Sequence, residues 1–79
     1  MVKVAVIGAT GYTGQELIRI LARHPSARLT VLTSRQNQGV IYGQLFPAFR
    51  NIIDLRISQL DYDQVAEAAE VAFLALPHT

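Results

Sequence analysis

The sequence contains no cysteine and little charge, and both shortages limit what the protein can be. Without cysteine these residues can form no disulfide, no cysteine-ligated metal site and no thiol nucleophile. Charged residues make up 16% of the chain, the net charge is +1, and the lysines and arginines form no basic stripe. We therefore expect no nucleic-acid partner.

Long hydrophobic runs are also missing. No apolar stretch of the sequence approaches the ~20 residues that a membrane-spanning helix needs. The first residues, Met1-Val2-Lys3, lead directly into a predicted strand rather than a signal peptide. We expect a cytoplasmic protein with no membrane segment.

What the sequence does have is apolar content: 51% of its 79 residues are hydrophobic, which argues for a packed core and against disorder. A chain of this length makes one small domain at most, and only roughly 60 to 65% of its unfolded surface becomes buried. We expect marginal stability and a single domain over residues 1–79.

The most informative stretch is a strand that turns through glycines into a helix. Val2–Ile7 is rich in β-branched residues, which is typical of a buried parallel strand. Tyr12–Arg23 has apolar residues at helical spacing and ends before Pro25. Between and within these elements the glycines form a G-x-x-G-x-x-G pattern, at Gly8, Gly11 and Gly14. Such a turn lets the backbone approach a dinucleotide pyrophosphate, which then meets the positive end of the helix.

The remaining chain continues the alternation of strands and helices. The predicted elements are a strand at Ala27–Thr33, a long loop at Ser34–Arg50 that could hold a short helical turn, and a strand at Ile52–Ile57. They are followed by a helix that Asp61 caps and that continues to Ala69, and by a strand at Val71–Leu76. In this helix we expect Tyr62, Val65 and Ala69 to face inward. This order predicts an α/β fold: the first, mononucleotide-binding half of a Rossmann-type parallel sheet, βαβ-βαβ. The chain stops where such folds place active-site loops, so we expect a fragment of a longer protein.

The glycine turn supplies most of the candidate binding residues. We expect the pyrophosphate to lie against Gly8, Thr10, Gly11, Tyr12, Thr13 and Gly14. Thr10 or Thr13 could instead cap the helix. The alternative for the glycines is purely structural: a tight turn and close helix packing.

The end of the second strand indicates which cofactor binds. An NAD site places Asp or Glu there, about 20 residues past the glycines, to accept a hydrogen bond from the ribose 2′-OH. This chain has Ser34 and Arg35 instead. Serine can hydrogen-bond a 2′-phosphate and arginine can hold its charge, so we expect NADP (NADPH). The alternative is that Arg35 is an ordinary solvated cation.

Other polar residues carry weaker signals. His24 beside Pro25 is most simply a helix-end residue, and Asp54, Asp61 and Asp63 show no pairing that suggests acid–base or metal chemistry. We expect no metal site. His78 follows a predicted strand end, where ligands bind in open α/β sheets, so it could line the nicotinamide site or serve only as a loop residue.

Four segments, in this order and spacing, closely resemble the N-terminus of N-acetyl-γ-glutamyl-phosphate reductases. They are Gly8-Ala-Thr-Gly-Tyr-Thr-Gly-Gln-Glu-Leu, Leu32-Thr-Ser-Arg, Gln44-Leu-Phe-Pro and Val71-Ala-Phe-Leu-Ala-Leu-Pro-His. Members of that family reduce N-acetylglutamyl phosphate to its semialdehyde with NADPH, in arginine biosynthesis. The resemblance implies an NADP-dependent oxidoreductase for the parent protein.

The family mechanism uses a cysteine thiolate, which attacks the acyl phosphate, and a histidine that assists as acid and base. The resemblance places both in a later substrate domain that this chain lacks, so we expect no catalytic residue here and an inactive chain on its own. It implies cofactor binding at the glycine turn, at Ser34 and Arg35, and at Pro77 and His78 near the nicotinamide. We expect the parent to act on an acyl phosphate and to be a homo-oligomer.

Several alternatives remain open. The aminoadipyl-phosphate reductases of lysine biosynthesis are similar at this end. Aspartate-semialdehyde dehydrogenases share the glycine turn and the Ser-Arg pair but commonly lack the tyrosine after the second glycine, and saccharopine-reductase-like proteins share the first motif. Outside these classes, the chain could be a non-catalytic nucleotide-binding module or a structural half-sheet that pairs through its open edge.

Overall fold

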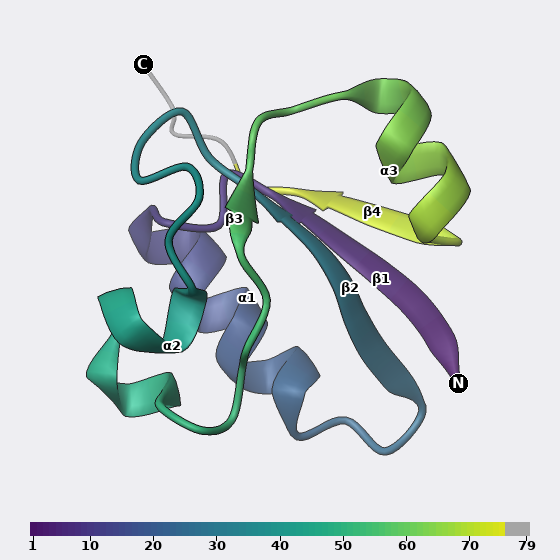
Figure 1. Ribbon diagram of the computed structural model, residues 1–79. Coiled ribbons are helices and arrows are strands. Elements are labelled where there is room, and N and C mark those ends of the chain that lie inside the picture. The colour runs from purple at the N-terminus through teal and green to yellow at the C-terminus, as the bar shows by residue number, and fades with distance from the viewer. Residues whose placement is uncertain (76–79) are drawn as a thin grey trace.

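The computed structural model describes residues 1–75 and confirms the predicted Rossmann-type sheet (Figure 1). Four parallel strands lie in the order β3-β2-β1-β4. The elements are β1 (Val2–Ile7), α1 (Tyr12–Ala22), β2 (Ala27–Thr33), α2 (Tyr42–Leu45), the 3-10 turn η1 (Pro47–Phe49), β3 (Ile57–Ser58), α3 (Tyr62–Ala68) and β4 (Val71–Leu74). Because all strands run parallel, their carboxyl ends and the loops that follow lie along one edge of the sheet.

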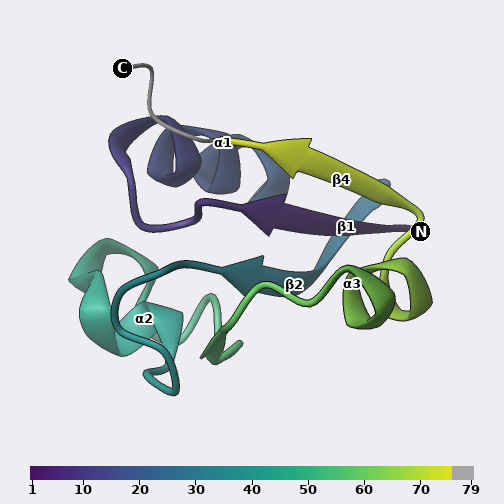
Figure 2. The same cartoon turned by 90° about the horizontal axis from the view of Figure 1, so that it is seen from above.

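Helices α1 and α2 lie on one face of the sheet and α3 lies on the other (Figures 1 and 2). The alternation of side chains along β1 divides the core into two corresponding layers. Val4 and Val6 pack into the larger cluster, which also receives residues of α1, α2 and η1. Ala5 points to the opposite face and packs in a smaller cluster with Val65 of α3. Helices therefore cover both faces of the sheet, as a buried parallel strand such as β1 requires.

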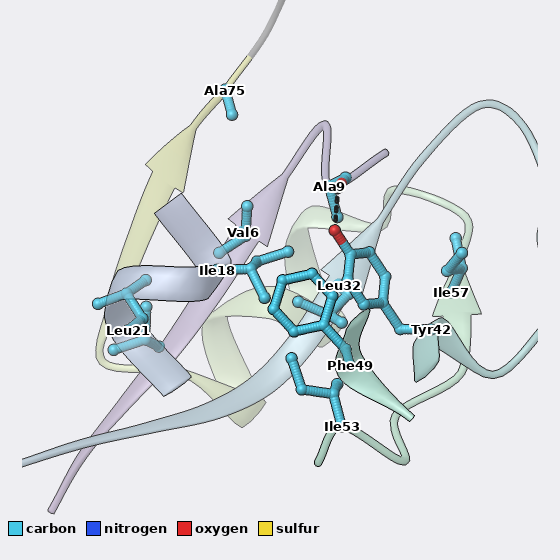
Figure 3. Close-up of a cluster of buried hydrophobic side chains, with 11 residues drawn as sticks. Val6, Ala9, Ile18, Leu21, Leu32, Tyr42, Phe49, Ile53, Ile57 and Ala75 are labelled. Atoms are coloured by element: carbon cyan, nitrogen blue, oxygen red, sulfur yellow. Dashed lines mark hydrogen bonds between the residues drawn. The ribbon is translucent and has the colours of Figure 1, made fainter. Parts of the chain in front are cut away.

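The larger cluster joins segments that are far apart in the sequence (Figure 3). Ile18 of α1, Leu32 of β2 and Tyr42 of α2 are all fully buried within it. Tyr42 also packs against two other aromatic rings, with centroid distances of 4.8 Å to Phe46 and 5.5 Å to Phe49. The predicted long loop at Ser34–Arg50 thus contains the expected helical turn, and it contributes to the core.

The helix predictions are confirmed, with one error in side-chain orientation. Asp61 caps α3, and its Oδ1 accepts hydrogen bonds from the backbone N–H groups of Asp63 and Gln64. Val65 faces the core as predicted, whereas Tyr62 is 73% exposed. Tyr62 is the first residue of α3, where its ring extends into solvent instead of onto the sheet.

The third strand is shorter than predicted. Within the expected Ile52–Ile57 strand only Ile57 joins the sheet, and Ile52 is 63% exposed. The reason is a competing set of hydrogen bonds: the carbonyl groups of Ile53 and Leu55 accept from the backbone N–H groups of Gly43 and Tyr42. This segment is held by α2 rather than by β2.

The fourth strand forms the edge of the sheet. Its pairing with β1 covers Val71 to Leu74, and the N–H of Ala75 donates to the carbonyl of Ile7 at 2.8 Å. All four residues of β4 are exposed, Leu74 to 69%. The last residue of the predicted Val71–Leu76 strand lies outside the described residues.

None of the helices in residues 1–75 has the length and apolar character required to cross a membrane.

Candidate dinucleotide-binding site

The site begins where β1 turns away from the sheet. Gly8 has a φ of 87°, in the left-handed region that favours glycine. Its N–H and that of Ala9 both donate to the carbonyl of Thr33, at 3.1 and 2.8 Å. The turn is therefore anchored to the end of β2, and it directs the chain into α1.

The second and third glycines serve different purposes. A Cβ on Gly14 would lie against the carbonyl oxygen of Gly8 and 2.9 Å from Ala9 Cα, so only glycine lets α1 pack this closely on the turn. A Cβ on Gly11 would have no neighbour closer than 3.9 Å, and Gly11 is exposed with an ordinary φ of -75°. Close packing thus explains Gly14, whereas nothing in residues 1–75 requires Gly11 to lack a side chain.

The start of α1 offers free hydrogen-bond donors. Gly11 is the N-cap residue, and no side chain of the described residues caps the helix, so the alternative in which Thr10 or Thr13 caps it is wrong. Within residues 1–75, the backbone N–H groups of Tyr12, Thr13 and Gly14 have no acceptor. Together with the helix dipole, such unpaired N–H groups form a site for anions, and the first turn contains no acidic side chain that would oppose them.

The structure brings the two predicted parts of the site together. Thr10 in the glycine turn and Ser34 after β2 are 24 residues apart in sequence, and their hydroxyl oxygens are hydrogen-bonded at 2.7 Å. Both side chains are partly exposed. The proposed pyrophosphate-binding turn and the proposed 2′-phosphate-binding loop are therefore adjacent at the carboxyl edge of the sheet.

The loop after β2 has a defined shape although its side chains are exposed. The N–H of Gln36 donates to Ser34 Oγ at 3.1 Å, and Gln38 Nε2 donates to the Ser34 carbonyl at 3.1 Å. Further along, the N–H of Gly39 donates to the carbonyl of Ile57 at 2.7 Å, which ties the loop to β3. Arg35 is exposed and pairs with no carboxylate among residues 1–75, so its guanidinium can meet a ligand.

Tyr42 is a residue of the site that the sequence analysis missed. Its hydroxyl donates to the carbonyl of Ala9 at 2.7 Å, and its side chain is completely buried (Figure 3). Burial raises the pKa of the Tyr42 phenol above its ordinary value, so this group stays protonated and remains a donor. A usable signal was present: Tyr42, Phe46 and Phe49 have the spacing of one buried helical face.

Gln15 was also missed. Its Nε2 donates to the Thr10 carbonyl at 3.2 Å and so links the first turn of α1 back to the glycine turn. Four backbone groups of the turn therefore have partners within the protein. Gly8 N and Ala9 N donate to Thr33, Ala9 O accepts from Tyr42, and Thr10 O accepts from Gln15. The turn is preorganised for a ligand.

The other predicted residues fall in several places. Tyr12 and Thr13 are exposed at the start of α1, beside the free N–H groups. His24 lies past the end of α1, where its Nδ1 accepts a hydrogen bond from the N–H of Ser26. Pro77 and His78 lie outside the described residues. Among residues 1–75, no group of three or more histidine, aspartate or glutamate side chains could hold a metal ion.

This donor set fits a dinucleotide. A φ-positive glycine, a helix start with unpaired N–H groups and hydroxyl and guanidinium donors one loop away together match a ligand with negatively charged phosphates. No acidic residue lies between Gly8 and Gln15 or between Ser34 and Phe49. The fold and this edge define a dinucleotide-binding α/β domain.

Comparison with protein families identifies the kind of domain. Residues 3–79 match the family described as "Semialdehyde dehydrogenase, NAD binding domain". The chain belongs to this family. Binding of a nicotinamide dinucleotide is the property that defines the family, and it agrees with the site described above.

Individual relatives confirm the resemblance to N-acetyl-γ-glutamyl-phosphate reductases. The chain is 49% identical over 78 residues to the reductase of that name from Alkalilimnicola ehrlichii and 46% identical to that from Desulforudis audaxviator. It is 45% identical to a LysW-L-2-aminoadipate/LysW-L-glutamate phosphate reductase from Sulfolobus acidocaldarius. Each comparison covers 99% of this chain and 22% of the relative, so the chain spans about a fifth of the length of these proteins.

A solved structure supports the fold. The crystal structure of aspartate semialdehyde dehydrogenase with NADP from Candida albicans aligns with a TM-score of 0.81 at 24% sequence identity. The alignment covers 98% of this chain and 24% of that one. The arrangement of strands and helices is therefore shared with a semialdehyde dehydrogenase.

Proposed function

We propose that these residues bind NADP in preference to NAD. The observation that carries the proposal is the pair of residues at the end of β2. Ser34 and Arg35, which pairs with no carboxylate in residues 1–75, stand there in place of an acidic residue. A 2′-phosphate can accept hydrogen bonds from both side chains, whereas an aspartate there would repel it. The NADP named with the structural neighbour from Candida albicans is consistent with this choice.

In this proposal each part of the site has its own task. The glycine turn and the free N–H groups at the start of α1 hold the pyrophosphate, with Thr10, Tyr12 and Thr13 beside it. Ser34 and Arg35 hold the 2′-phosphate. NADPH, when bound, supplies a hydride to the substrate. Pro77 and His78 remain candidates for the nicotinamide side.

For the whole protein we propose the reductive dephosphorylation of an acyl phosphate to an aldehyde. N-acetylglutamyl phosphate is the favoured substrate, because relatives 46 to 49% identical bear the name N-acetyl-gamma-glutamyl-phosphate reductase. The 79 residues contain no cysteine, so a thiol nucleophile for this reaction would come from outside them. We expect these residues by themselves to bind the cofactor without reducing a substrate.

A second candidate substrate is a carrier-bound aminoadipyl phosphate. The relative from Sulfolobus acidocaldarius, whose name gives LysW-L-2-aminoadipate and LysW-L-glutamate as alternatives, is 45% identical, nearly as similar as the N-acetylglutamyl-phosphate reductases. Incubating the full-length protein with each acyl phosphate and following NADPH oxidation distinguishes the two. Faster turnover of N-acetylglutamyl phosphate supports the first candidate, and turnover of only the carrier-bound substrate supports the second.

The cofactor proposal is tested by calorimetric titration of the full-length protein with NADPH and, separately, NADH. Two charge-assisted hydrogen bonds to the 2′-phosphate predict that NADPH binds at least about tenfold more tightly. Equal affinities, or tighter binding of NADH, would refute the assignment of Ser34 and Arg35 to the 2′-phosphate.

A further inference from the structure

We propose that Thr10 is a positioning residue for cofactor selection: through its hydroxyl contact with Ser34 it orients the Ser34 hydroxyl as a donor toward the 2′-phosphate. The inference rests on the proposed NADP preference. It concerns a residue in the glycine turn, which by its place in the sequence would be assigned only to the pyrophosphate. The carrying observation is the 2.7 Å distance between Thr10 Oγ1 and Ser34 Oγ.

The hydrogen-bonding capacity of Ser34 decides whether its hydroxyl is free to donate to a ligand. A serine hydroxyl has one donor hydrogen and two acceptor lone pairs. One lone pair of Ser34 Oγ already accepts the N–H of Gln36 at 3.1 Å. If Thr10 donates to the second lone pair, only the Ser34 O–H remains, and it must be donated outward.

The two possible directions of the Thr10–Ser34 hydrogen bond suit different ligands. A phosphate oxygen only accepts, so it needs Ser34 as a donor and therefore Thr10 as the donor to Ser34. If instead Ser34 donates its hydroxyl hydrogen to Thr10, it has only a lone pair left to present to the phosphate. A ribose 2′-OH both donates and accepts, so NAD can bind with either direction and gains little from Thr10.

Two probes without a nicotinamide isolate this effect from catalysis. Both 2′,5′-ADP and 5′-AMP contain the adenosine and the 5′-phosphate, and only the first carries a 2′-phosphate. Any direct contact of Thr10 with the 5′-phosphate changes both affinities equally and cancels in their ratio. The ratio therefore reports on the 2′-phosphate alone.

The decisive variant is Thr10→Val in the full-length protein, which removes the hydroxyl and keeps the shape. We expect the ratio of 2′,5′-ADP affinity to 5′-AMP affinity to fall about fivefold, the size of one hydrogen bond, whatever Thr10 contributes at the 5′-phosphate. Thr10→Ser should restore the wild-type ratio. The Ser34→Ala variant should itself show a weaker preference for 2′,5′-ADP, with Arg35 still in place. In that background Thr10→Val should have no further effect on the ratio.

Thr30→Val is the matched control. The Thr30 hydroxyl donates to the Val4 carbonyl at 3.3 Å within the sheet, away from the loop after β2. We expect it to leave both affinities unchanged. If Thr10→Val lowers the melting temperature too far for titration, Thr10→Ala repeats the test with a smaller side chain.

The outcomes separate this inference from the proposed function. If Thr10→Val weakens both probes equally, or weakens neither, the proposed role of Thr10 is overturned. The NADP proposal then still stands, provided that the wild-type protein prefers 2′,5′-ADP. Equal binding of both probes by the wild-type protein would instead overturn the NADP proposal, and the role of Thr10 with it.

Discussion

The glycine turn and the loop after β2 lie next to each other, yet they are held in place by different means. In the turn, Gly14 and Ala9 are buried and the Ala9 carbonyl accepts a hydrogen bond from a buried tyrosine. In the loop, Arg35 and the residues up to Gly39 are exposed, and hydrogen bonds along its length give it its shape. A substitution in the turn therefore perturbs the core, whereas one in the loop can alter recognition and leave the fold intact.

The largest expected effect is that of Gly14→Ala. The added methyl would lie against the Gly8 carbonyl and 2.9 Å from Ala9 Cα, both backbone atoms that cannot move aside as a side chain would. We expect the free energy of unfolding to fall by about 3 kcal/mol, the upper part of the range for overpacked cores. Urea denaturation measures this loss. An unchanged midpoint would show that α1 does not depend on close contact with the turn.

Arg35→Asp is the corresponding change in the loop. It replaces a cation with an anion beside the expected 2′-phosphate, so NADPH affinity should fall by about 100-fold, while NADH affinity is kept or gained. Stability should not change. Arg28→Asp makes the same change of charge at the start of β2 and should leave both affinities near wild type. If the two variants behave alike, long-range charge rather than a local contact explains the preference.

Tyr42→Phe tests how the core supports the turn. Removing the hydroxyl leaves the buried Ala9 carbonyl without its donor, and we expect a loss of about 1 to 3 kcal/mol in the free energy of unfolding. Tyr62→Phe is the control, since that ring is 73% exposed, and should have no measurable effect. A matching loss in both variants would mean that the Tyr42 hydrogen bond does not matter.

The same hydroxyl predicts a pH dependence. Burial raises the pKa of Tyr42, so its stabilising contribution is complete below the unfolded value of about 10 and declines as pH rises above it. The wild-type protein should therefore lose stability relative to Tyr42→Phe in alkaline solution. Parallel stability curves for the two proteins above that pH would contradict the prediction.

Local patterns in the sequence predicted most of the fold. Val2–Ile7 and Ala27–Thr33 appear as strands with the predicted bounds, and the Asp61 cap is present, because hydrophobic spacing and capping depend on neighbouring residues. The prediction of a strand at Ile52–Ile57 was wrong because carbonyl groups of this segment accept hydrogen bonds from α2. This is a tertiary effect that no local pattern contains. Apolar, β-branched composition alone cannot distinguish the two outcomes.

For the site, the sequence predicted residue types better than it predicted their connections. The spacing of the glycines and the Ser34-Arg35 pair were visible as motifs. The contacts from Thr10 to Ser34 and from Tyr42 to Ala9 join residues 24 and 33 positions apart, and they follow from the way the sheet brings strand ends together. Such contacts set the orientation of the donors, which a motif does not specify.

The Gly11→Ala variant completes the test of the central claim. That claim is that the turn binds what both cofactors share and the loop binds only the 2′-phosphate. A methyl on Gly11 would meet no described residue closer than 3.9 Å, but it intrudes where a pyrophosphate would approach the backbone. The most direct measurement is calorimetric titration of Gly11→Ala and Arg35→Asp with NADPH and NADH. We predict that Gly11→Ala weakens both cofactors equally, by about tenfold, and that only Arg35→Asp changes their ratio. A changed ratio in Gly11→Ala, or equal weakening of both cofactors in Arg35→Asp, would contradict this division of tasks.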